Sequence, residues 1–326
     1  MNLIELFDSL EVPEGDLGVF NAISIPEHLE FRIAKDCNEN AILLLSIPNR
    51  IGVKSLKNIR LKYLQLQHNV DCKISENGNS QIQSLTVVTF SSNDNDLLRY
   101  FLRISESLIY AVGINPTQDG LIIALERFIE VFKGLSNSPS KSISGLWSEL
   151  FLIESATNSR VLLEYWHLSP EEKFDFNAGT EKIEVKSSSL FERKHIFSSE
   201  QLNPPENSTV LIASIFVKQS TNGMSIGQLV DRISEKIGGD LELIDKMNRV
   251  VCKTLGNSIE ESLGFKFDYN VAIQSKLFYN AMDVSKIEKN CIPKSVSLVK
   301  FQSDLSTSPT FEINHHDGVH ELFNAI

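Results

Sequence analysis

The fold of this chain is decided by residues 174–188, which read FDFNAGTEKIEVKSS. Because successive side chains of a strand point to opposite faces, Glu184 and Lys186 lie on one face and their apolar neighbours lie on the other. Residues 177–180 have the composition of a turn, so the pattern predicts a hairpin that brings Asp175 beside Glu184. Two carboxylates and an ammonium group then converge at one point.

Such a group of charges has a definite chemical use. Mg²⁺ is a hard ion that binds one or two carboxylates together with water and phosphate oxygens, so Asp175 and Glu184 are predicted ligands for Mg²⁺ or Mn²⁺. Lys186 can orient or deprotonate a metal-bound water, or stabilise charge that develops on the phosphate. The two close carboxylates should repel each other until the ion binds, so the metal should stabilise the fold. The implied reaction is metal-dependent hydrolysis of nucleic acid.

The tripeptide Glu-x-Lys is common, and this chain repeats it at Glu171-x-Lys173 and Glu192-x-Lys194. The alternative interpretation is therefore a half-exposed strand that carries a surface ion pair. The pair at 184–186 differs from the other two because apolar residues occupy both its preceding and its middle positions. An aspartate also lies upstream of it at hairpin spacing.

A second acid of interest lies in the segment 145–154, GLWSELFLIE. Its apolar residues recur at helical spacing, and Ser142 or Ser144 can serve as the N-cap of a helix. Glu149 falls among apolar neighbours in this pattern. It is either an ordinary solvated helix glutamate or a third acid that approaches the metal from the helix before the core sheet.

These segments follow one another in a known order. The helix at 145–154, an expected strand at 160–166 and the hairpin at 174–188 resemble the α-β-β-β start of the restriction-endonuclease-like fold. With residues 193–198 and 201–202 added, the run is similar to a bacterial family of PD-(D/E)xK motif proteins of otherwise unknown function.

The resemblance, which is strongest over residues 143–203, implies one divalent-metal site. Asp175, Glu184 and Lys186 would build this site, with Glu149 as an accessory acid. The strict Pro-Asp dipeptide of the motif is absent, because a phenylalanine precedes the aspartate. Many members of the superfamily lack that proline.

Three further residues receive a role from the resemblance alone. Arg193, His195 and Gln201 would lie on the next strand and at the start of the following helix or loop, near bound phosphate. His195 has an alternative as a partly buried strand histidine, since Ile196 and Phe197 follow it.

The chain of 326 residues with 42% hydrophobic composition suits two domains, or one large domain with an elaboration. We expect an α/β (α+β) protein with a smaller N-terminal α+β domain at 1–135 and a linker at 136–142. A restriction-endonuclease-like α/β/α domain with a mixed central sheet should follow at 143–326, with a helical elaboration around 225–263. Strands are also expected at 29–34, 41–47, 59–67, 82–90, 210–217, 265–273 and 295–301, and helices after Asp94 and Thr117.

A zinc site is a weaker alternative near the C-terminal end. His316 and His320 have the spacing of two imidazoles on one helix face, next to His315. Gly318 interrupts that helix, and no acid stands where a zinc hydrolase of this type needs one. Solvated histidines are the expected outcome.

The formal net charge of −11 limits the functional interpretation, because lysines and arginines supply most non-specific DNA affinity. Either a small basic patch or partner subunits must bring the chain to DNA, and we favour the partners. Residues 1–8 lack the basic start of a signal peptide, no apolar run is long enough to span a membrane, and the dispersed cysteines fit a reducing cytoplasm.

The sequence thus predicts a cytoplasmic, Mg²⁺-dependent endodeoxyribonuclease. The resemblance further implies the cutting subunit of a bacterial restriction or antiphage defence system, with motor, sensor or methylase partners. Two alternatives stay open: a catalytically silent nuclease-fold scaffold or DNA-binding subunit, and an RNA-cleaving enzyme. A homodimer is possible.

Overall fold

The computed structural model describes residues 2–14, 18–46, 57–76, 79–169, 172–313 and 321–326. The chain divides into two compact units, Met1–Ser138 with Gly256–Glu260, and Pro139–Leu255 with Glu261–Ile326. The chain first passes from one unit to the other between Ser138 and Pro139, inside the segment expected to be a linker.

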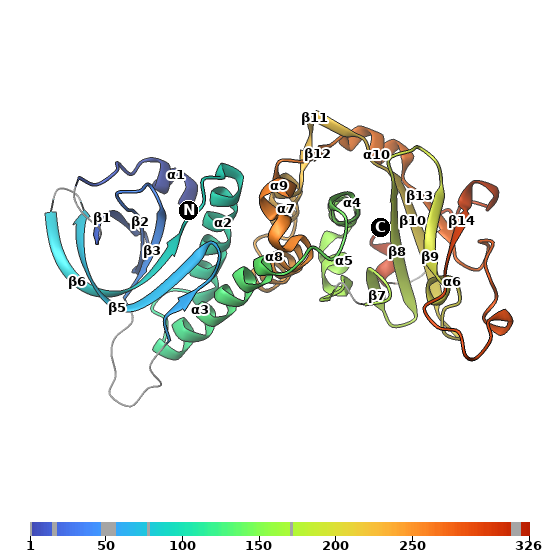
Figure 1. Cartoon of the computed structure of the whole chain (residues 1–326), viewed down its shortest axis with the longest axis horizontal. Helices are drawn as coiled ribbons and strands as arrows, with labels where there is room; N and C mark the ends of the chain where they lie inside the picture. Colours follow the sequence, from blue (N-terminus) through green and yellow to red (C-terminus); the bar gives the residue numbers. More distant parts are fainter. Residues whose placement is uncertain (1, 15–17, 47–56, 77–78, 170–171, 314–320) are drawn as a thin grey trace. The chain divides into compact units, whose positions relative to one another are not determined.

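The first unit is built around a six-stranded sheet (Figure 1). Its strands are β1 (Val19–Ile25), β2 (His28–Lys35), β3 (Ala41–Leu45), β4 (Ile59–Arg60), β5 (Leu64–Glu76) and β6 (Asn79–Phe90). They run in the order β1-β2-β3-β6-β5-β4, and β1 also pairs with β5 in parallel, so the sheet closes on itself. The enclosed side chains form an apolar core of Phe20, Ala22, Ala34, Ile42, Leu44, Cys72, Ile74, Leu85 and Val87.

The prediction of a single strand over residues 59–67 is wrong. The chain reverses after Arg60, where the Leu61 N–H donates to the Leu64 carbonyl at 2.8 Å, so β4 and β5 form an antiparallel hairpin. The apolar run therefore belongs to two strands, which periodicity alone does not separate.

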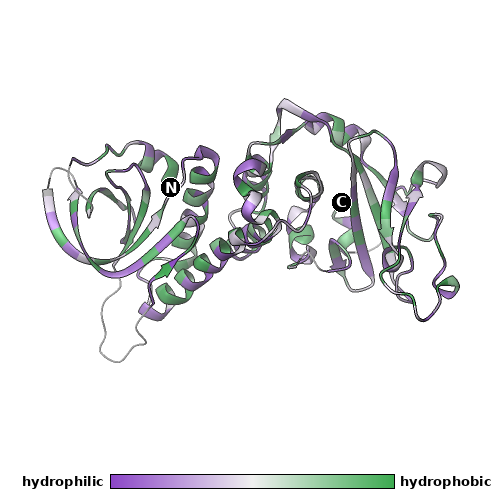
Figure 2. Ribbon diagram, viewed as in Figure 1, coloured by the Kyte–Doolittle hydropathy of each residue, from purple (hydrophilic) through white to green (hydrophobic). Residues whose placement is uncertain are grey.

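Helices form after Asp94 and Thr117 as predicted, and a further helix lies at the start of the chain. The unit contains α1 (Leu3–Asp8), α2 (Asn95–Val112), α3 (Gln118–Lys133) and the 3₁₀ turn η1 (Gly134–Ser136). Asp94 and Thr117 cap α2 and α3 with their side-chain oxygens. Hydrophobic and hydrophilic bands alternate along both helices (Figure 2). The apolar side packs on the sheet, where the rings of Phe90 and Phe101 stack with centroids 4.5 Å apart.

The second unit contains a mixed four-stranded sheet. Its members are β7 (Phe176–Ala178), β8 (Glu181–Ser188), β10 (Thr209–Phe216) and β13 (Leu277–Asn280), in the order β13-β10-β8-β7. β8 and β10 are parallel, and the outer pairs are antiparallel. The chain is therefore a mixed α/β protein. β10 is the predicted buried strand, because the run of apolar residues at 210–213 is fully covered.

Smaller strand pairs and helices complete this unit. They are α4 (Ile143–Glu154), α5 (Ser159–Tyr165), β9 (Lys194–Ser198), α6 (Ser199–Leu202), β11 (Gln219–Ser225), α7 (Ile226–Lys236), α8 (Leu241–Leu255), β12 (Lys266–Phe267), α10 (Tyr269–Ser275), η3 (Lys289–Cys291), β14 (Lys300–Asp304), η4 (Leu305–Thr307) and α11 (Glu321–Asn324). The 3₁₀ turn η2 (Gly256–Ser258) belongs to the first unit, and α9 (Ile259–Leu263) begins there and ends in the second. β9 pairs with β14, and β11 pairs with β12. Figure 1 shows α4 and α5 on one side of the sheet, with β9, β14 and α6 on the other.

Three expected strands differ from the structure. Residues 160–166 are not a strand, because the Asn158 side chain caps a helix there and α5 forms instead. Residues 265–273 form the short β12, after which Asp268 caps α10. The last expected strand begins only at Lys300. The order before the candidate site is thus α-α-β-β.

Within the parts of the chain that the structure describes, every helix is too short or too polar to cross a membrane.

The β11–β12 pair supports α4, because the Trp147 indole N–H donates to the Met224 carbonyl at 2.8 Å. This pairing leaves no space at Gly223, where a Cβ atom would overlap the backbone of Phe267. We predict that Gly223→Ala lowers the free energy of unfolding by about 1–3 kcal/mol, the usual cost of overpacking. Chemical denaturation measures this change. Gly264→Ala is the control, because its Cβ would lie 3.7 Å from the Glu261 carbonyl, and an equal loss there would contradict the explanation.

Candidate functional site

The predicted hairpin forms at β7 and β8. Phe176 pairs with Ile183, and Gly179 makes the turn with a φ of 75°, a value that glycine adopts without strain. Asp175 lies directly before β7, and its Oδ2 accepts a hydrogen bond from the Val185 N–H at 2.8 Å. This bond fixes the carboxylate against the strand that carries the Glu-x-Lys pair.

Glu184 and Lys186 lie together at the middle of β8. Their side chains form an ion pair, with Lys186 Nζ 2.8 Å from Glu184 Oε1, and Glu184 is only 5% exposed. Gln201 joins them from α6, donating to Glu184 Oε1 at 2.6 Å and accepting from Lys186 Nζ at 3.3 Å. A capping box between Ser198 and Gln201 fixes that helix. The interpretation as a half-exposed surface pair is therefore wrong.

Glu149 is not a solvated helix residue either. It is 2% exposed, and every residue of α4 from 146 to 154 is buried. Glu149 Oε2 accepts from the Trp166 indole N–H at 2.8 Å and lies 2.9 Å from His167 Nε2. The helix preceding the sheet thus presents a buried acid to the site, as the sequence suggested.

Lys141 links this acid to the hairpin. Its Nζ lies 2.6 Å from Glu149 Oε1 and 2.6 Å from Asp175 Oδ1, and 3.2 Å from His167 Nε2. Glu149, His167 and Asp175 each offer a ligand atom within 4.8 Å of the others. The described residues therefore converge on one buried polar centre.

The charges of this centre interact strongly. Burial and the negative charge of Asp175 raise the pKa of Glu184 to about 8, although Lys186 opposes the shift. Burial and the charge of Glu149 likewise raise the pKa of Asp175. Repulsion between close carboxylates is expected to raise their pKa values, and both of these shifts are upward.

The pKa of Glu149 is shifted in the opposite direction. Burial alone would raise its pKa, but the hydrogen bond from His167 and the charge of Lys141 outweigh burial and lower it. Burial alone would lower the pKa of Lys141, but the charges of Asp175 and Glu149 outweigh burial and raise it. The centre holds a fixed ammonium beside a fixed carboxylate.

The donor chemistry fits a divalent metal ion. Buried carboxylate oxygens are the ligands of hard cations, and a cationic group, the Lys141 ammonium, already lies between two of them. Asp175 and Glu184 could hold Mg²⁺ or Mn²⁺. The imidazole of His167 adds a nitrogen donor on the side of Glu149.

Comparison with known families gives a match over most of the chain. Residues 3–306 match the model of the family described as "Putative PD-(D/E)XK family member, (DUF4420)". The chain belongs to this family. The comparisons with curated proteins and with solved structures found no match.

Two residues to which the PD-(D/E)XK resemblance assigned substrate contacts are engaged within the protein. Arg193 donates to the carbonyl oxygens of Ser214 and Ser275 at 3.0 and 2.6 Å, and its guanidinium lies over the ring of Phe216. His195 is buried, with Nε2 2.8 Å from the Ser214 hydroxyl. Both side chains contact Ser214 of β10 and hold this strand in place. Their contact with phosphate stays a prediction.

Sequence reasoning missed three residues of this PD-(D/E)XK site. Lys141 was assigned to the linker, although it directly precedes Ser142, the N-cap of α4. Trp166 is the last residue of the segment expected to be a strand, and His167 follows it. An adjacent tryptophan and histidine just before the hairpin were the available signal. His315, His316 and His320, the alternative zinc ligands, lie outside the described residues.

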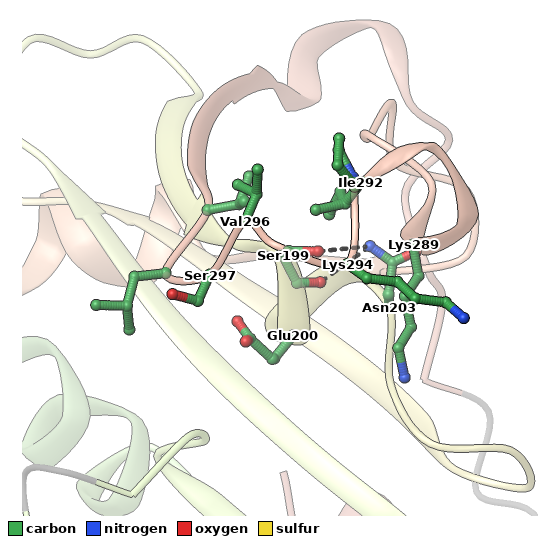
Figure 3. A pocket seen from close by; sticks show the side chains of 11 residues that line it. Ser199, Glu200, Asn203, Lys289, Ile292, Lys294, Val296 and Ser297 are labelled. Atoms are coloured by element: carbon green, nitrogen blue, oxygen red, sulfur yellow. Dashed lines mark hydrogen bonds between the residues drawn. The ribbon is translucent and has the colours of Figure 1, made fainter.

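A surface pocket of about 300 Å³ lies beside α6 (Figure 3). Ser199, Glu200 and Asn203 line one side of it, and residues from 289–299 line the rest. The Asn203 side chain points to Ser199 and donates to its carbonyl at 2.9 Å. Gln201 of the same helix contacts Glu184 and Lys186 instead, so the pocket is separate from the acidic centre.

The lowered pKa of buried His195 predicts that the stability of the protein depends on pH. Burial, with the charges of Lys186 and Arg193, lowers its pKa from 6.5 to about 4. The unfolded chain therefore binds a proton more readily between these values, so stability falls as the pH falls from 6.5 to about 4. Because the unfolded chain takes up this proton first, the free energy of unfolding should fall by about 2 kcal/mol between pH 7 and pH 5.

Chemical denaturation at pH 7 and pH 5 measures this loss in wild type and in His195→Asn. The variant should lose less stability between the two pH values, by about that amount. Equal losses in the two proteins would show that the imidazole takes up its proton without unfolding.

Proposed function

We propose that this chain is a divalent-metal-dependent endodeoxyribonuclease with a restriction-endonuclease-like α/β/α core, preceded by a smaller α+β domain. The observation that carries the proposal is the hairpin that holds Asp175 against β8 beside the buried pair of Glu184 and Lys186. A strand pair has no structural need for this arrangement, because burying charges costs free energy unless they are closely compensated. Family membership supports the same conclusion.

Asp175 and Glu184 would hold Mg²⁺ or Mn²⁺, and a bound ion would lower the pKa of water and polarise a phosphate oxygen. Lys186 would orient the attacking water or stabilise charge on the phosphate. Gln201 keeps Glu184 and Lys186 in register by bonding to both. Glu149 acts through Lys141, which also contacts Asp175. Arg193 and His195 would act near phosphate mainly by positioning β10.

The biological setting is part of the proposal. The net charge of −11 disfavours strong binding to DNA by the isolated chain, so partner subunits would deliver it. We propose the cutting subunit of a bacterial restriction or antiphage defence system in the cytoplasm, with motor, sensor or methylase partners, and a homodimer stays possible. The second candidate is a catalytically silent scaffold or DNA-binding subunit of such a complex, and the negative charge favours the scaffold form.

The direct test is cleavage of supercoiled plasmid, methylated and unmethylated, with Mg²⁺ or Mn²⁺. We predict that wild type cuts and that Lys186→Ala cuts at least about 100-fold more slowly, because it lacks the ammonium at the reacting phosphate. The matched control is Lys194→Ala in the exposed Glu192-x-Lys194 tripeptide, whose rate should stay within a few-fold of wild type.

Equal cutting by wild type and Lys186→Ala would place the activity elsewhere. If neither protein cuts, with or without candidate partner proteins, the scaffold alternative is favoured. A chain that cuts RNA and not the plasmid would change the substrate class and leave the site in place.

Metal binding should also raise thermal stability, because the ion would compensate the repelling carboxylates. An ion at about 100 times its Kd adds about 2.7 kcal/mol, or about 5 °C in Tm. Thermal unfolding with and without Mn²⁺ measures this shift. Asp175→Asn should lose the shift, whereas exposed Asp283→Asn should retain it. The ligand set is wrong if Asp175→Asn is stabilised as much as wild type.

A further inference from the structure

The ammonium of Lys141 lies where a metal ion could bind. Three ligand atoms surround it, one each from Glu149, Asp175 and His167, at 2.6, 2.6 and 3.2 Å. Divalent ions bind carboxylate oxygen and imidazole nitrogen at about 2.0–2.2 Å, so the three atoms need to contract by about 0.5–1 Å. Side-chain movement alone can supply such a contraction.

The charge balance favours a divalent ion over the lysine. Glu149 and Asp175 together carry two negative charges when ionised, and Lys141 supplies one positive charge. One negative charge is left without a full partner in a buried place, since Lys186 is paired with Glu184. An ion of charge +2 would neutralise both acids.

His167 is ready to act as a ligand. Its backbone N–H donates to the Asp175 carbonyl at 2.9 Å, which fixes the residue beside the cluster. The side chain is 2% exposed, and its Nδ1 is buried without a hydrogen-bond partner among the described residues. Nε2 lies 2.9 Å from an acceptor, Glu149 Oε2, and 3.2 Å from a donor, Lys141 Nζ. A metal bound at Nε2 would replace the hydrogen bond to Glu149, and the ring proton would then lie on Nδ1.

Lys141 can leave the cluster. Its side chain is 22% exposed, whereas those of Glu149 and Asp175 are 3% and 9% exposed. Lys141 directly precedes the N-cap of α4, so its own backbone lies outside that helix. The flexible four-carbon stem can turn toward solvent while the three ligands stay in place.

We propose that Glu149, His167 and Asp175 form a second metal site, and that a divalent transition-metal ion fills it by displacing Lys141. The inference rests on the proposed function in one respect: Asp175 would be a ligand of both ions, the one in this site and the one that Asp175 and Glu184 would hold. The nitrogen ligand distinguishes the two sites. Imidazole favours Co²⁺ or Ni²⁺, whereas an all-oxygen site suits Mg²⁺.

The test is direct titration with Co²⁺, followed by visible absorption and calorimetry. His315, His316 and His320 are replaced by alanine in every protein, because these histidines are themselves possible Co²⁺ ligands. We expect Lys141→Met to bind Co²⁺ at least about 10-fold more tightly, since the competing charge is gone. Lys300→Met, at an exposed lysine of β14, is the matched control and should leave the affinity unchanged.

His167→Gln should weaken Co²⁺ binding at least about 10-fold, because it removes the imidazole and keeps a donor for Glu149. Glu184→Gln should keep the site and its response to Lys141→Met. Pulsed electron paramagnetic resonance of Co²⁺ bound to the parent protein needs no His167 variant to fold, and it should detect a coordinated nitrogen.

Unchanged or weaker Co²⁺ binding by folded Lys141→Met would overturn the displacement of Lys141. Wild-type affinity in His167→Gln, or no nitrogen coupling to Co²⁺, would overturn the ligand set. None of these readouts involves cleavage, so a protein that binds Co²⁺ as expected but cuts no nucleic acid contradicts the proposed function alone.

Discussion

Compensation of buried negative charge is the constraint on which the second unit depends. Glu149, Asp175 and Glu184 lie at one point with almost no exposure to solvent. Glu149 and Asp175 share Lys141, and Glu184 pairs with Lys186. N–H donors of Trp166 and Val185 add hydrogen bonds to Glu149 and Asp175. Removing one partner of a buried ion pair costs about 3–5 kcal/mol, which is a large part of the stability of a domain.

The architecture can be understood from this requirement. The sheet provides β8, the strand from which Glu184 and Lys186 project, and α4 brings Glu149 to the same side as Asp175. Trp147 ties α4 to β11, and the capping box of α6 places Gln201 against β8. The apolar packing of this unit thus holds a polar centre in a fixed geometry. A preorganised polar centre of this kind is what catalysis on a charged substrate requires.

Much of the site was predictable from the sequence because its rules are local. Strand alternation places Glu184 and Lys186 on one face, and Gly179 allows the turn of the hairpin. The apolar neighbours of Glu149 left two alternatives, a solvated and a buried acid, and the structure shows the buried one. The strand expected at 160–166 was wrong because a short apolar run suits either element, and the cap at Asn158 decides for a helix. The contact between Lys141 and His167 could not be predicted, since the two residues meet only in three dimensions.

The central claim is that Asp175 and Glu184 hold a catalytic metal ion beside Lys186. Anomalous diffraction from crystals of the protein grown with Mn²⁺ tests it most directly, because it locates the ion without an assay of activity. We predict an anomalous peak within bonding distance of both carboxylates, with Lys186 turned away from Glu184 toward the substrate side. A Mn²⁺ peak away from Asp175 and Glu184, with the ion pair of Glu184 and Lys186 intact, would contradict the claim.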